Sequence, residues 1–139
     1  MKAKTPLKIL GINLILFGAL FGLISVNKDF LRPMSSHHPV VGILTGSFPN
    51  FIAAYIISLA PANAVLIRQP KNGRLIVYLA ASLVFLVLAV EEIVPMWGAS
   101  THYDLYDIIG SFLGSVLAVL TYESIQRSKL LTRKFFSPD

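Results

Sequence analysis

Four of the seven acidic residues of this chain lie in one short stretch between two long apolar runs. They are Glu91, Glu92, Asp104 and Asp107, and His102 lies between the two pairs. Carboxylates at the edge of a membrane span are costly to place there, so they indicate a functional site. The group could bind a cationic or sugar-bearing ligand, coordinate a metal, or perform acid–base catalysis.

The metal and catalytic interpretations differ in what they require. Carboxylate and amide oxygens suit a divalent cation such as calcium or magnesium, and His102 with carboxylates suits zinc. A close carboxylate pair suits acid–base catalysis, because neighbouring carboxyl groups hold their protons unequally. No spacing here is as specific as a dedicated metal or nucleophile motif. The absence of cysteine excludes thiolate ligands, disulfides and cysteine nucleophiles. A divalent cation is the one cofactor suggested, and an enzyme is not the first interpretation.

Composition places these residues in a membrane protein. The chain has 139 residues, of which 55% are hydrophobic and 14% charged, and its mean hydropathy is +0.69. That is too apolar for a soluble domain of this size. The net charge of +5 would suit nucleic acid, but the cations lie at the ends of apolar runs. Their distribution therefore encodes topology, and we expect no nucleic-acid partner.

The apolar runs predict an all-α membrane protein, a single domain with four transmembrane helices. Each run has about the 20 residues that cross a hydrocarbon core. The first run follows a basic start, as in a signal peptide, but it is too long and no A-x-A site follows, so we expect an uncleaved span. Two prolines in residues 27–39 are expected to preclude a continuous helix there. The expected spans are residues 9–26, 49–68, 75–94 and 104–125.

The second apolar run, residues 40–67, is longer than one straight span requires. Ser47 offers a helix cap, and Pro49 is tolerated in a first turn. We therefore expect the span to begin at Pro49, with residues 40–46 forming a re-entrant or interfacial segment. The alternative is a span over residues 40–60 that ends at Pro61.

Lysine and arginine predict the orientation. Ten of the twelve lie at the N-terminus, in the turn at residues 68–74 and in the C-terminal tail, whereas Lys28 and Arg32 lie on the other side. The positive-inside rule then places both termini in the cytoplasm. We expect a multi-pass protein of the cell (inner) membrane, with the acidic stretch and all three histidines facing outward.

The acids are expected to lie at one depth. Glu91 and Glu92 end the third span, and Asp104 and Asp107 open the fourth from the same side. One face of the fourth span is small or polar at spacings of three and four and should point into the bundle. That face comprises Asp104, Asp107, Ser111, Gly114, Ala118 and Thr121. The apolar residues Phe112, Leu113, Val116, Leu117 and Leu120 should face lipid or neighbouring helices.

We predict that Glu92, Asp104 and Asp107 form one site. Three charges so close need a cation, a proton or a donor such as His102 to compensate them. Asn50 is the expected neutral partner, and Ser111 completes the ligand-binding set. Glu91 points about 100° away around the helix and should matter less.

Simpler interpretations stay open for these residues. Asp104 could be only a helix N-cap, and Asp107 a first-turn acid that the helix dipole favours. The histidines could be ordinary loop residues. The aromatic residues Trp97, Tyr103 and Tyr106 fit an interfacial belt better than a stacking platform.

Three glycine pairs suggest helix contacts. They are Gly18-xxx-Gly22, Gly42-xxx-Gly46 and Gly110-xxx-Gly114. Such pairs let helix backbones approach closely within a bilayer. Beyond lipid, the expected partners are therefore another membrane protein or a second copy of the chain.

The acidic stretch resembles the VanZ-like family of small bacterial membrane proteins, named for a teicoplanin-resistance protein. Glu92 matches the acid at the end of one span, and Asp104 and Asp107 match the family's D-x-x-D pair. Gly114 matches the glycine that follows, and Asn50 the helix-opening asparagine. The resemblance covers residues 47–114.

The chain departs from the family pattern at three positions. Pro95 stands where a glutamine is usual, Thr101 near the usual arginine, and Ser111 at the usual asparagine. The resemblance implies an envelope-related role, concerning glycopeptides or cell-wall precursors, and no particular reaction.

The first functional hypothesis is a non-enzymatic envelope protein whose outward acidic pocket binds a ligand. The second is a membrane-embedded hydrolase or transferase that acts on a lipid-linked substrate through Glu92 with Asp104 or Asp107. The third is a small subunit or anchor of a membrane protein complex.

The topology predicts a labelling pattern. Single cysteines at Lys71 and Ser100 should react with an impermeant thiol reagent from opposite sides of the membrane. Labelling from the same side would refute the four-span topology.

Overall fold

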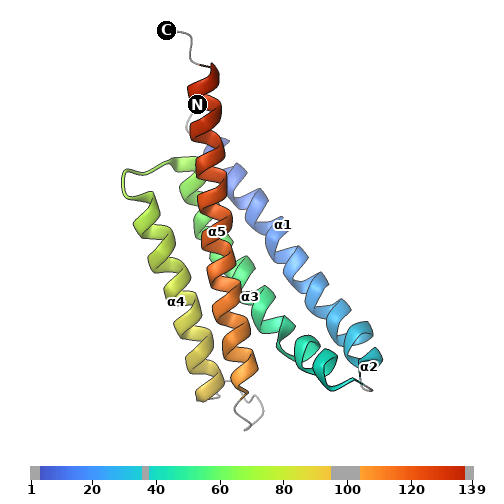
Figure 1. Ribbon diagram of the computed structural model, residues 1–139. Coiled ribbons are helices and arrows are strands. Elements are labelled where there is room, and N and C mark those ends of the chain that lie inside the picture. Colours follow the sequence, from blue (N-terminus) through green and yellow to red (C-terminus); the bar gives the residue numbers. More distant parts are fainter. Residues whose placement is uncertain (1–3, 36–37, 95–103, 137–139) are drawn as a thin grey trace.

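The computed structural model describes residues 4–35, 38–94 and 104–136, which form an all-α bundle of long helices (Figure 1). Four of these helices are long and apolar enough to cross a membrane, which confirms the predicted four-span architecture. Both ends of the chain lie at the same end of the bundle (Figure 1), as an even number of crossings requires. The four helices are α1, Lys4–Val26; α3, Pro39–Arg68; α4, Gly73–Ile93; and α5, Leu105–Phe136.

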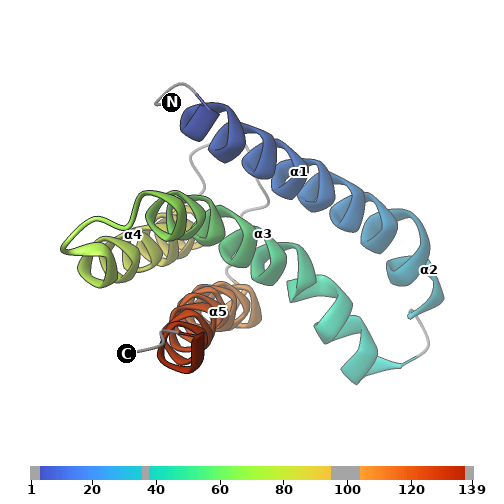
Figure 2. The ribbon, with the colours of Figure 1, turned by 90° about the horizontal axis from the view of Figure 1, so that it is seen from above.

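Helix α3 is the centre of the bundle. It packs against α1, α4 and α5, whereas α1 packs on α3 alone among the other long helices. Seen from above, α1 lies on one side of α3, and α4 and α5 lie on the other (Figure 2). The position of every other span is therefore set by its contact with α3 or with a helix that packs on α3.

The predicted bounds of α4 and α5 are close to the observed ones at most ends. Residues 75–94 were expected where α4 covers Gly73–Ile93, and residues 104–125 where the apolar part of α5 covers Leu105–Lys129. The helix α5 continues beyond this span, because no proline or glycine interrupts the polar tail before Phe136.

The prediction that the first helix ends before residue 27 is wrong. A π-helical segment η1, Asn27–Leu31, and a short helix α2, Arg32–Met34, continue α1, so the candidate span covers Thr5–Met34. Pro33 is tolerated because it lies in the first turn of α2, where its missing N–H matters least.

The predicted re-entrant segment is also absent, since residues 40–46 form the first turns of α3. Ser47 is not a cap but lies inside the helix, where its Oγ donates a hydrogen bond to the Ile43 carbonyl oxygen at 3.1 Å. The alternative end at Pro61 is wrong as well, because α3 passes through both Pro49 and Pro61.

Side chains from outside α3 compensate the interruption at Pro49. A helical proline lacks an N–H and pushes away the carbonyl groups of the preceding turn. The Thr45 carbonyl oxygen accepts a hydrogen bond from Asn27 Nδ2 at 2.8 Å, and the Gly46 carbonyl oxygen accepts one from Arg32 at 3.0 Å. The extension of α1 thus supplies the donors that make a continuous α3 possible in lipid.

Of the three glycine pairs, Gly110-xxx-Gly114 lies at a helix contact. A Cβ on Gly110 would lie 2.9 Å from the Ser47 carbonyl oxygen, and a Cβ on Gly114 would overlap the Phe51 carbonyl oxygen. By contrast, a Cβ on Gly18, Gly22 or Gly46 would meet nothing within 4 Å. The close approach of α5 to α3 therefore depends on the third pair.

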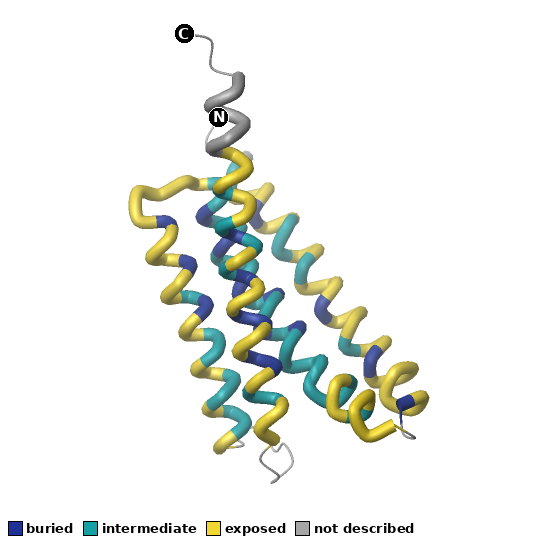
Figure 3. Tube along the Cα trace, viewed as in Figure 1, coloured by how far each residue is buried: buried dark blue, intermediate teal, exposed yellow. Residues whose placement is uncertain are grey.

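The buried residues of α5 lie on the face that contacts α3. Ser111, Gly114 and Ala118 are buried, and the predicted lipid-facing residues of α5, from Phe112 to Leu120, are exposed. Figure 3 shows the buried positions on α3 and on the sides of α4 and α5 that turn toward it. A hydrogen bond adds to the contact between α1 and α3, where Asn63 Nδ2 donates to Asn13 Oδ1 at 3.0 Å.

We predict that Gly114→Ala weakens the bundle, because the added methyl group meets the α3 backbone. Overpacking of this kind costs about 1–3 kcal/mol. The measurement is thermal unfolding of the detergent-solubilised protein. Gly18→Ala is the matched control and should unfold at the temperature of the unmodified protein. Equal unfolding temperatures for Gly114→Ala and Gly18→Ala would contradict the helix contact.

Candidate functional site

The acids at the junction of α4 and α5 hold the start of α5. Asp104 is the N-cap of this helix, since the backbone N–H of Tyr106 donates to Asp104 Oδ1 at 2.9 Å. Glu92, from the last turn of α4, accepts the backbone N–H of Asp104 at 3.1 Å. Both carboxylates satisfy N–H groups that have no partner within the helix and lie at the positive end of its dipole.

Asp107 has a different environment from the other two acids. It is half-buried in the first turn of α5, and Asn50 of α3 lies within hydrogen-bonding reach of its carboxyl group. Its Oδ1 atom is buried and has no hydrogen-bond partner among the described residues. A buried acceptor without a donor is costly, so Asp107 is the residue of this group whose function the local fold does not explain.

The charges that act on Asp107 come from three helices. Among the described residues they are Glu92 of α4, Asp104 at the start of α5 and Arg32 of α2. Glu91 is not among them. The three acids therefore lie near one another, although two of them also serve the backbone of α5.

The remaining predicted residues lie at different depths. Ser111 is 1% exposed, one helical turn beyond Asp107, on the face that packs against α3. Asn50 is half-buried on α3 close to Ser47, against which Gly110 packs. Asn50 and Asp107 thus meet at the mouth of the α3–α5 contact, and Ser111 lies inside it.

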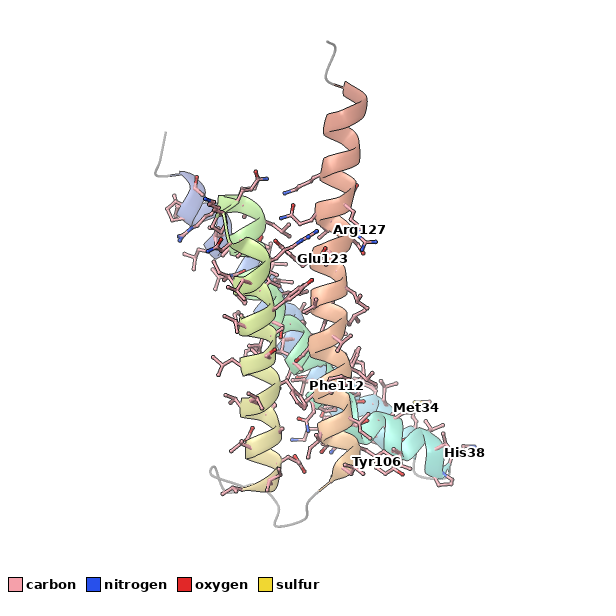
Figure 4. All side chains as sticks on the ribbon, turned by 60° about the vertical axis from the view of Figure 1, so that its left-hand side comes forward. Met34, His38, Tyr106, Phe112, Glu123 and Arg127 are labelled. Atoms are coloured by element: carbon pink, nitrogen blue, oxygen red, sulfur yellow. The ribbon has the colours of Figure 1, made fainter. Side chains whose placement is uncertain are left out.

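Several predicted residues lie outside the described part of the chain. These are His37, Pro95, Trp97, Thr101, His102 and Tyr103. Tyr106, at the start of α5, is exposed and labelled in Figure 4. An exposed tyrosine at the end of a span is typical of an interfacial belt.

The described residues provide no ready metal site. No three histidine, aspartate or glutamate side chains within residues 4–35, 38–94 and 104–136 are arranged to hold a metal ion. Among the described residues, the cation that acts on Asp107 is Arg32.

Sequence reasoning missed Arg32 and Asn27 as parts of this end of the bundle. Arg32 is one of two cations on the predicted outer side, and this scarcity was a signal of its role. Asn27 is fully buried, and its role follows from Pro49, which frees a carbonyl oxygen for it. Neither contact could be inferred without knowing that α1 continues to Met34.

No family model matches the chain, and neither a curated protein nor a solved structure matches it.

We predict that the two substitutions Asp104→Ala and Asp104→Asn have different effects. Alanine removes the cap and should lower the free energy of unfolding by about 0.5–2 kcal/mol, whereas asparagine caps a helix as well as aspartate does. Thermal unfolding in detergent measures the difference. If the asparagine variant is as unstable as the alanine variant, Asp104 acts through its charge and not as a cap.

Proposed function

We propose that this chain is a non-enzymatic, VanZ-like protein of the bacterial inner membrane whose outward-facing acidic pocket binds an envelope-related ligand. The observation that carries the proposal is the buried Oδ1 of Asp107, which has no hydrogen-bond partner among the described residues. A ligand that donates a hydrogen bond or carries a positive charge would satisfy this atom.

The surrounding residues support a ligand of mixed polarity. Glu92 and Asp107 offer carboxylate oxygens to an amino group or to sugar hydroxyls. Arg32 is exposed at the same end and offers donors to a carboxylate. Glycopeptides and peptide-bearing cell-wall precursors combine these groups, and the resemblance at Glu92, Asp104 and Asp107 points to the same class.

The distribution of charge supports an outward-facing position for the acidic pocket. Lys71 and Arg74, in the turn before α4 and at its start, lie at the end opposite the acids, and the positive-inside rule places that end in the cytoplasm. The acidic pocket then opens toward the compartment in which the cell wall is built.

We predict that the chain lowers the sensitivity of a bacterium to teicoplanin and that Asp107→Asn abolishes this effect. The neutral side chain keeps the shape but removes the charge that would hold an amino group. Glu92→Gln should reduce the effect for the same reason. The measurement is the inhibitory concentration in a glycopeptide-sensitive host, with equal amounts of each variant in the membrane.

Glu91→Gln is the matched control and should act like the unmodified chain, since Glu91 is not among the charges identified around Asp107. An unmodified chain without effect, or a sensitive Glu91, would refute the proposal. Turnover of lipid-linked sugars by the purified protein would instead assign a hydrolase or transferase. A stoichiometric protein partner in mild detergent would favour a subunit or anchor.

A further inference from the structure

A groove runs between α4 and α5 on the side of the bundle away from α1. It has a volume of about 270 Å³, and its walls are mainly apolar. Its lining includes Ala81, Ser82 and Phe85 of α4 and Phe112, Val116 and Val119 of α5. The rings of Phe85 and Phe112 meet edge to face, with centroids 5.5 Å apart, and narrow the groove near its outer end.

The groove continues toward the basic end of the bundle. A second cavity of about 290 Å³ shares Tyr78, Val119 and Leu120 with the first and extends to Glu123 and Arg127. In Figure 4, Phe112, Glu123 and Arg127 follow one another along α5. The two cavities thus form one path from an apolar, aromatic end to a cationic end.

The charges at the cationic end favour an anion. Glu123 is only 14% exposed, and both of its oxygens are engaged, one by Arg74 at 3.1 Å and the other by the Tyr78 hydroxyl at 3.0 Å. Arg74 therefore neutralises Glu123, and Arg127 adds a positive charge one turn further along α5. Each such cation near an anionic headgroup contributes about 1 kcal/mol.

The length of the path matches one leaflet of a bilayer. Phe112 and Glu123 lie roughly 16 Å apart along α5 at 1.5 Å per residue. Half of a hydrocarbon core is about 15 Å thick. A lipid whose acyl chain lies in the groove from Phe112 onward would therefore have its headgroup at the level of Arg127.

We propose that the α4–α5 groove binds one anionic phospholipid of the inner leaflet, with an acyl chain along Val116 and Val119 and the phosphate group beside Arg127. The site is separate from the acidic pocket, which lies at the other end of α4. It accounts for the shape, the depth and the charge of the groove together.

The test is lipid binding to the delipidated, detergent-solubilised full chain, followed by native mass spectrometry. Phosphatidylglycerol should bind saturably with one molecule per chain. Phosphatidylethanolamine has the same phosphate and acyl chains, but its ammonium group offsets the phosphate charge. It should therefore bind about fivefold more weakly, as expected if its attraction to one cation is cancelled. Glycerol phosphate, which lacks the chains, should not compete.

Two pairs of variants distinguish binding of the lipid's acyl chain from binding of its headgroup. Ser82→Trp fills the groove from its exposed side and should abolish saturable binding, whereas Leu83→Trp, on exposed surface outside the groove, should bind normally. Arg127→Gln should weaken phosphatidylglycerol alone, by about fivefold. Arg68→Gln removes a cation away from the groove and should have no effect. If Ser82→Trp does not fold, Val116→Trp fills the groove from α5.

Four results would overturn the proposal. Normal phosphatidylglycerol binding by a folded groove-filling variant would exclude the groove. Equal binding of the two phospholipids, or tight binding of glycerol phosphate alone, would exclude the assigned headgroup or chain. A dimer that Ser82→Trp abolishes, with lipid binding unchanged, would assign the groove to a second copy of the chain.

Discussion

The close approach of α5 to α3 at Gly110 and Gly114 is the contact on which the arrangement of this protein depends. Lipid offers no hydrophobic drive for helices to associate, so backbone contact at small residues must supply the packing energy. At this crossing the α5 backbone lies against Ser47 and Phe51. The same crossing fixes the register of Asp107, one turn before Gly110, against Asn50. The candidate site is thus a consequence of helix packing, and a shift of α5 along α3 would separate its members.

A second constraint ties α1 to the same end of the bundle. Pro49 interrupts the hydrogen bonding of α3, and a carbonyl group exposed in a membrane costs several kcal/mol if nothing satisfies it. Asn27 and Arg32 donate to the two carbonyl groups concerned. Arg32 also acts on Asp107, so one side chain serves both the α3 backbone and the acidic cluster of Glu92, Asp104 and Asp107. The proline therefore links the extension of α1 to the site, although α1 does not pack on α5.

The parts of the fold that the sequence predicted are those that depend on local pattern. Hydropathy located α4 and the start of α5, and spacing along α5 identified the face with Ser111 and Ala118 that turns inward. Prolines misled the prediction at Pro33 and Pro49. The donors that compensate Pro49 come from Asn27 and Arg32, which are distant in the chain. The glycine pairs have the same limitation, since their spacing reveals a capacity for contact but not which pair finds a partner.

The candidate site shows a similar division. The acids were visible because carboxylates are rare at the edge of a span, and the cap geometry of Asp104 follows from its position before α5. Sequence alone did not separate Asp107 from the others, because burial of its Oδ1 depends on how α5 lies against α3. Arg32 was hidden because η1 and α2, which continue α1 to Met34, were not predicted.

Disulfide cross-linking between α3 and α5 tests this packing most directly. The chain has no cysteine, so a pair introduced at Ser47 and Gly110 would be unique. A Cβ on Gly110 would lie 3.5 Å from the Ser47 Cβ and 2.9 Å from the Ser47 carbonyl oxygen. A small outward shift that relieves the second contact keeps the two Cβ atoms within the range of about 3.5–4.5 Å found in disulfides. We predict rapid cross-linking of this pair in native membranes under mild oxidation. A control pair at Gly46 and Gly110 should stay reduced, because a Cβ at Gly46 meets nothing within 4 Å. Failure of the first pair, or equal cross-linking of both, would contradict the register that places Asp107 beside Asn50.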